Sequence, residues 1–192
     1  MKIVLSIFVV AVLIASFGFY QYSKVEAKKT EENIMTDKKI LIAYYSHSGN
    51  TKAVAEKIKN VTGGDIVEII PEKPYPNGYN ELVELAKVEK TNNVMPKIKP
   101  IGKNVADYDV VFVGTPVWWY TMASPVKTFI ADNNFDGKTI APFCTHGGGG
   151  ESATFTDMKK LVPNATVKTG FSTYERTAND KNVADWIKSL NL

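Results

Sequence analysis

Cysteine and histidine are scarce in this chain of 192 residues, which contains one Cys and two His. The single cysteine, Cys144, excludes an intrachain disulfide bond and a cysteine-rich metal site. His47 and His146 supply too few ligands for an ordinary zinc site. We therefore expect no metal centre, and the lone thiol does not indicate the redox compartment.

A strong excess of either charge is also missing. The chain has 23 basic and 20 acidic residues, a formal net charge of +3, and no run of five like charges. It contains no zinc-finger spacing, no RNP-like segment and no basic helix. The sequence therefore predicts no nucleic-acid partner.

The local signatures of several enzyme classes are absent. The chain has no G-x-G-x-x-G dinucleotide fingerprint and no G-x-S-x-G nucleophile elbow. A C-x₅-R phosphatase built on Cys144 would need arginine at the position of Gly150. A response-regulator receiver would need Asp at the end of the first predicted strand, where Tyr44 and Tyr45 stand. No catalytic residue is assigned from the sequence.

One long hydrophobic run is present, and it lies at the N-terminus. Residues 3–20 are eighteen residues without a charge, and they follow Lys2. Such a run is typical of a signal peptide or of a membrane-spanning helix. Val25 and Ala27 would suit cleavage after Ala27, so both interpretations stay open.

This run divides the chain into three parts. We expect residues 1–27 to be a signal peptide or membrane anchor, 28–38 a polar linker, and 39–192 a globular domain. The protein is then expected to be membrane-anchored or secreted, outside the cytoplasm, with membrane association through its N-terminal segment. Its orientation stays open, because lysines lie on both sides of the apolar run.

Strand and helix signals alternate through the globular part. Five apolar runs predict strands, at 40–45, 65–70, 110–113, 139–145 and 165–171. Between and after them, helices are predicted at 51–61, 79–90, from Pro125 onward, at 153–162 and around 183–190. This order predicts an α/β fold with an open five-stranded parallel sheet and helices on both faces.

Two residues within this pattern carry specific expectations. Gly114 follows the third apolar run and is expected to end that strand. Pro142 lies inside the fourth run, although proline has no N–H to donate within a sheet. We therefore expect Pro142 at a bulge or beside an unpaired position.

The segment after the first predicted strand is suited to bind a phosphate. The free N–H groups and the dipole at a helix N-terminus attract anions, and hydroxyl and amide side chains add donors. No Lys or Arg lies inside this segment, so neutral donors are expected to hold the phosphate. The alternative is an ordinary helix start capped by Ser48 or Asn50. The phosphate loop consists of Ser46, His47, Ser48, Gly49, Asn50 and Thr51.

Two more unusual loops should leave the same edge of the sheet. Three consecutive aromatic residues follow the third strand, where a flat ligand could cover them, although core packing would account for at least one. Four glycines follow the fourth strand, where they allow close backbone approach to a ligand or form a flexible connection. The candidate binding residues here are Pro116, Val117, Trp118, Trp119, Tyr120, Thr145, His146, Gly147 and Gly148.

The three loops together indicate one kind of ligand. In an open α/β sheet, sites form at the carboxyl ends of the strands. A phosphate site, an aromatic platform and a glycine-rich backbone suit a planar heterocycle that carries one phosphate. FMN fits that description.

The chain resembles the flavodoxin family from about Lys39 to Leu192, and it is closest to short members with Trp-Trp and Cys-Thr-His-Gly-Gly loops. The phosphate segment [ST]-x-[ST]-G-x-T of flavodoxins is met at 46–51, and the two other segments at 116–119 and 143–148. The resemblance implies strand order 2-1-3-4-5 and non-covalent FMN, with its ring between the second and third loops. Carrier flavodoxins are strongly acidic, whereas this chain is basic.

The leading hypothesis is an FMN-binding redox protein that exchanges electrons with a redox partner protein or a small acceptor. An FMN-dependent NAD(P)H:quinone-type reductase is the alternative, so the sequence leaves open whether the chain is a carrier or an enzyme. Two remoter hypotheses are a serine hydrolase and an anchored module without cofactor. The hydrolase would pair Ser46 or Ser48 with His47 or His146.

Overall fold

The computed structural model describes residues 38–192. The predicted signal peptide or anchor, 1–27, and nearly all of the predicted linker, 28–38, lie outside the described residues. Within 38–192, no helix has both the length and the apolar character needed to cross a membrane. The description below concerns this part of the chain alone.

Strands and helices alternate in the described part, as the sequence predicts, apart from two places where one strand directly follows another. A short 3₁₀ helix, η1 (Val105–Asp107), precedes the third strand. The strands are β1 (Ile40–Tyr44), β2 (Asp65–Glu68), β3 (Val110–Trp118), β4 (Thr121–Met122), β5 (Thr139–His146), β6 (Thr166–Val167) and β7 (Phe171–Tyr174). The helices are α2 (Asn50–Thr62), α3 (Tyr79–Thr91), α4 (Ser124–Ala131), α5 (Thr154–Leu161) and α6 (Asp180–Ser189).

The sheet has the predicted parallel order. Its path is β2-β1-β3-β5-β6, and β7 also pairs in parallel with β5. The fourth predicted strand is β5, and β6 and β7 together take the place of the fifth, so the order 2-1-3-4-5 is confirmed. All five residues of β1 are buried, as expected of a strand covered on both faces.

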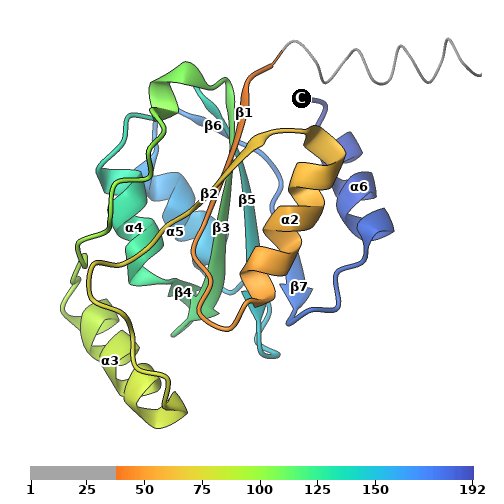
Figure 1. The fold of residues 1–192 in the computed structure, drawn as a ribbon. Helices are drawn as coiled ribbons and strands as arrows, with labels where there is room; N and C mark the ends of the chain where they lie inside the picture. The colour runs from red at the N-terminus through yellow and green to blue at the C-terminus, as the bar shows by residue number, and fades with distance from the viewer. Residues whose placement is uncertain (1–37) are drawn as a thin grey trace, which may run out of the picture. The chain divides into compact units, whose positions relative to one another are not determined.

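Helices cover both faces of the sheet. Figure 1 shows α2 and α6 on one face and α4 and α5 on the other. The helix α4 buries an apolar stripe at helical spacing, formed by Val126, Phe129 and Ile130. The loops that follow β1, β3 and β5 lie together at the lower edge of the sheet in Figure 1.

Gly114 does not end the third strand, contrary to the sequence prediction. β3 continues through it, and Gly114 pairs with Tyr44 of β1 and with Phe143 of β5. A Cβ atom on Gly114 would lie 2.1 Å from Cζ of Phe143. Glycine therefore stands here because a large ring packs directly over the backbone.

Pro142 lies beside an interruption in the neighbouring strand, as expected. Val167 pairs with Ile140 and Phe171 pairs with Phe143, so residues 168–170 face only Ala141 and Pro142. Three residues opposite two form a bulge that splits the predicted strand 165–171 into β6 and β7. The Ile140 carbonyl accepts from Lys168 on this side, and Pro142 faces the same side because strand residues alternate. The missing N–H of Pro142 therefore falls on the side where the pairing with β6 and β7 is interrupted.

Replacing Gly114 with alanine should destabilise the protein. The added methyl group would overlap the Phe143 ring inside a buried strand, which typically costs about 1–3 kcal/mol. Chemical denaturation measures the change in the free energy of unfolding. Gly147→Ala is the matched control, since nothing lies within 4 Å of a Cβ there, and it should change stability by less than about 0.5 kcal/mol. Equal stabilities for the two variants would contradict the close packing of Phe143 on Gly114.

Candidate functional site

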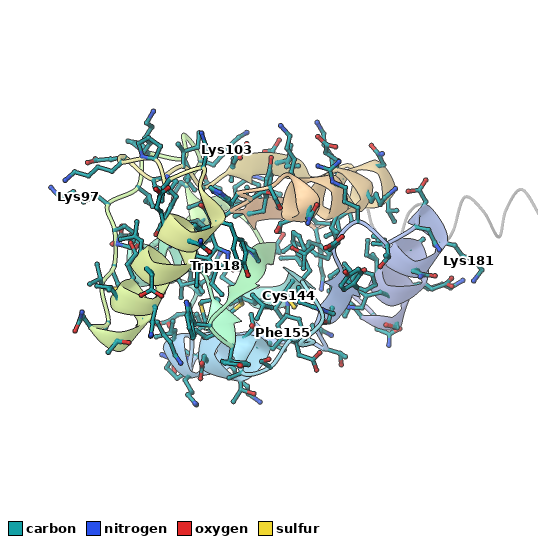
Figure 2. All side chains as sticks on the ribbon, turned by 90° about the horizontal axis from the view of Figure 1, so that it is seen from below. Lys97, Lys103, Trp118, Cys144, Phe155 and Lys181 are labelled. Carbon is teal, nitrogen blue, oxygen red and sulfur yellow. The ribbon has the colours of Figure 1, made fainter. Side chains whose placement is uncertain are left out.

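A cleft of about 550 Å³ opens at the carboxyl edge of the sheet. All three predicted loops contribute to its lining. Its volume lies within the ordinary range for small-molecule and cofactor sites, about 300–1,000 Å³. Figure 2 looks onto this edge from below and labels Trp118, one of the lining residues.

Most of the predicted site residues meet in this cleft. Those that line it are His47, Ser48, Asn50, Pro116, Val117, Trp118, Trp119, Tyr120, Thr145, His146 and Gly147. The four that do not line it belong to the same loops: Ser46, Gly49, Thr51 and Gly148. The fold therefore gathers one set of side chains from three separate places in the sequence.

The phosphate loop is an uncapped helix start. Gly49 precedes α2 with φ 84°, a left-handed conformation that favours glycine, and no side chain caps the helix there. The predicted alternative, capping by Ser48 or Asn50, is therefore not the observed arrangement. The first turn of α2 contains no acidic residue, so its free N–H groups keep their attraction for an anion.

Hydroxyl groups of this loop differ in what they contact. Thr51 is buried, and its Oγ1 lies 2.9 Å from Oγ1 of Thr145, which joins the first loop to the third. Ser46 Oγ is also buried but has no hydrogen-bond partner among the described residues. An unsatisfied buried hydroxyl is costly, and a phosphate oxygen in the loop would satisfy it. This orphaned group fits a phosphate ligand.

Trp118 forms part of an aromatic cluster at the floor of the cleft. Its ring meets Tyr75, Tyr45 and His47 edge-on, at centroid distances of 5.0, 5.4 and 6.1 Å. Tyr75 donates a hydrogen bond of 2.6 Å to the buried carboxylate of Glu89. Burial, together with this carboxylate, raises the pKa of Tyr75 above its ordinary value, so its hydroxyl stays protonated. Trp118 is therefore packed on several sides by aromatic rings, and the Tyr75–Glu89 hydrogen bond fixes one of them.

Trp119 and Tyr120 form a two-residue hairpin turn between β3 and β4. Both have positive φ, 47° and 68°, although neither is glycine. Trp119 donates from Nε1 to the Val83 carbonyl at 2.8 Å and so fastens the hairpin to α3. The predicted loop after the third strand is thus largely a β-hairpin, with Tyr120 at its tip and 68% exposed.

The glycine-rich loop after β5 is folded back on itself. The Gly148 N–H donates to Nδ1 of His146 at 3.2 Å, and Gly148 and Gly150 have φ of 124° and 66°. No Cβ on Gly147, Gly148 or Gly150 would meet an atom within 4 Å, so their backbone borders open space. His146 is a hydrogen-bond acceptor in this loop, and neither it nor His47 is hydrogen-bonded to Ser46 or Ser48 in the described part. This geometry gives no support to the serine hydrolase hypothesis.

Sequence reasoning missed one wall of the cleft and part of its rim. The wall comes from α3, which the sequence predicts as a helix at 79–90. Nothing in that local pattern indicates that the helix lies beside the site. The missed lining residues are Tyr79, Leu82, Val83, Ala86, Gly149, Ser152 and Glu175. Arg176, next to Glu175, contacts the phosphate loop from 126 residues away in the sequence, and no local pattern could have revealed it.

Comparison with known proteins gives consistent similarities. The family model described as flavodoxin matches residues 39–190. A candidate flavoprotein from Bacteroides eggerthii DSM 20697 has a similar crystal structure, with TM-score 0.73 and 33% identity over 81% of this chain and 99% of that one. A second, from Bacteroides uniformis ATCC 8492, has TM-score 0.72 and 28% identity over 79% and 98%. A flavoprotein from Lactobacillus acidophilus NCFM, crystallised in complex with FMN, has TM-score 0.63 and 26% identity over 78% and 99%.

The Cys144 thiol should be unreactive in the folded protein. Burial in β5 raises its pKa to about 12, so almost no thiolate is present at pH 8. Titration with a thiol reagent such as Ellman's should detect less than about 0.1 thiol per chain natively and one thiol in guanidinium chloride. Fast native labelling at pH 8 would show that β5 opens at this position.

Proposed function

The chain belongs to the flavodoxin family, and on this basis we propose that it binds FMN non-covalently and acts as a redox protein. The observation that carries the proposal is the cleft itself, in which an uncapped helix start, an aromatic wall and an open glycine-rich backbone meet. The FMN complex of the similar Lactobacillus acidophilus protein supports the choice of ligand.

The phosphate would lie in the first loop. There the free N–H groups of α2 and the hydroxyls of Ser46 and Ser48 would donate to its oxygens. Asn50 lines the cleft and would add amide donors. Thr51 contributes through its backbone, because its hydroxyl is already bonded to Thr145.

The flavin ring would lie between the aromatic and glycine-rich loops. Bound FMN supplies the electron-transfer chemistry, so the chain needs no acid–base residue or metal of its own. Trp118 and Trp119 are held in place by the Tyr75 cluster and by Val83, and they would exclude water from the ring. The backbone carbonyl of Tyr120 accepts a hydrogen bond from the Ala153 N–H, but its side chain is exposed, so the Tyr120 ring would cover the flavin on binding.

We further propose electron exchange with a redox partner protein or a small acceptor at the rim of the cleft. The rim includes the exposed Tyr120 and Glu175, so an edge of the bound ring would stay accessible. In this proposal the chain is an electron carrier, and the FMN-dependent reductase remains the alternative.

The first test is the visible spectrum of the purified full-length chain after incubation with FMN and desalting. Flavin bands should remain with the wild-type protein. Ser48→Glu should lose them, because a carboxylate in the phosphate loop would repel the phosphate. Thr91→Glu, which adds the same charge on an exposed position at the end of α3, should retain them. Flavin retained by Ser48→Glu would remove the phosphate assignment, and a folded, colourless wild type would overturn FMN binding.

A second test separates a carrier from a reductase. The FMN-loaded protein should oxidise NADH or NADPH with a quinone acceptor no faster than free FMN at equal concentration. Absorbance at 340 nm follows the reaction. Saturable turnover well above that of free FMN would contradict the carrier proposal and establish the reductase alternative.

A further inference from the structure

Arg176 contacts the phosphate loop from the turn between β7 and α6. Its Nε donates to Asn50 Oδ1 at 2.9 Å, and its Nη2 donates to the Ser48 carbonyl at 3.1 Å. Nη2 also lies 2.9 Å from the place where a Cβ of Gly49 would be, so the guanidinium packs against the loop backbone. These contacts reach three consecutive residues of the predicted phosphate loop.

The turn that carries Arg176 is itself well fixed. The hydroxyls of Thr173 and Thr177 lie 3.1 Å apart, and Thr177 donates to the Tyr174 carbonyl through both its N–H and its hydroxyl. Glu175, with φ 42°, donates its N–H to the His146 carbonyl. The turn is thereby bonded to the end of β5, and Arg176 is held in position beside the loop.

The bond to Asn50 has a chemical consequence. A guanidinium can only donate, so the Asn50 atom that faces Arg176 must be the carbonyl oxygen. The amide nitrogen, with its two N–H groups, is then turned away from Arg176. Because Asn50 lines the cleft, these donors are available to a ligand in it.

Arg176 is not paired with a carboxylate in the described part of the chain, although Glu175 is its neighbour in the sequence. The four salt bridges within residues 38–192 join other residues, and Asp180, four positions further along the chain, pairs with Lys57. Two hydrogen bonds use two of the five N–H groups of a guanidinium. Although the phosphate loop contains no basic residue, the fold therefore supplies one cation beside it.

We propose that Arg176 is a positioning residue that makes the site selective for a flavin bearing a phosphate monoester over an unphosphorylated flavin. This inference rests on the proposed FMN-binding function. Arg176 orients the Asn50 amide so that its N–H groups donate to the phosphate, and its charge adds long-range attraction for a dianion. A flavin without phosphate gains from neither effect.

The experiment compares dissociation constants for FMN and riboflavin, measured by quenching of flavin fluorescence with the full-length protein. Arg176→Gln should weaken FMN binding about ten- to hundred-fold and change riboflavin binding less than about three-fold. Lys181→Gln is the matched control, since it removes the same charge from an exposed position on α6, and it should change both constants less than about two-fold.

Asn50→Ala provides an independent variant and a double-mutant cycle. Alone it should also weaken FMN selectively, because it removes the amide that Arg176 orients. Adding Arg176→Gln to Asn50→Ala should cost clearly less than adding it to the wild type, since the two residues act together. Fully additive effects would overturn the assigned route through Asn50.

The outcomes separate this inference from the proposed function. If Arg176→Gln weakens FMN and riboflavin equally, Arg176 only stabilises the loop, and the inference is wrong while FMN binding stands. Unchanged affinity for FMN would also overturn it. If the wild type binds neither flavin, the proposed function fails and the inference fails with it.

Discussion

The position of β3 between β1 and β5 is the constraint on which the site depends. Tyr44, Gly114, Phe143 and Phe171 are paired at one level across four parallel strands. Parallel strands in this register end near one another, so the loops that follow them lie together and line the cleft. Gly114 fits this position because its missing side chain makes room for the Phe143 ring.

The Thr51–Thr145 hydrogen bond extends this constraint into the site. It is buried, and it joins the first turn of α2 to the end of β5. The bond therefore couples the position of the phosphate loop to that of the glycine-rich loop. On the other side, Trp119 fastens the aromatic hairpin to α3 through the Val83 carbonyl. A ligand entering the cleft meets walls that are already in place, which lowers the entropic cost of binding.

Much of this arrangement could be predicted from the sequence because its signals are local. Apolar runs, helix periodicity and loop composition predict the strands, the helices and the three candidate loops. The missing N–H of proline predicts that Pro142 lies beside an unpaired position. The prediction that Gly114 ends the strand is wrong, because the glycine is required by the packing of Phe143, a residue from another strand. The α3 wall and Arg176 depend on contacts between distant segments, which no short pattern encodes.

The Trp119–Tyr120 turn places folding stability and ligand contact in opposition. A hairpin of this kind requires positive φ at both turn residues, which favours Gly or Asn and costs other residues about 1 kcal/mol each. Selection for a more stable scaffold would thus tend to replace Tyr120 with glycine, and so remove an exposed ring from the rim of the cleft. A substitution that raises thermal stability at this hairpin would therefore remove an aromatic contact from the ligand cleft.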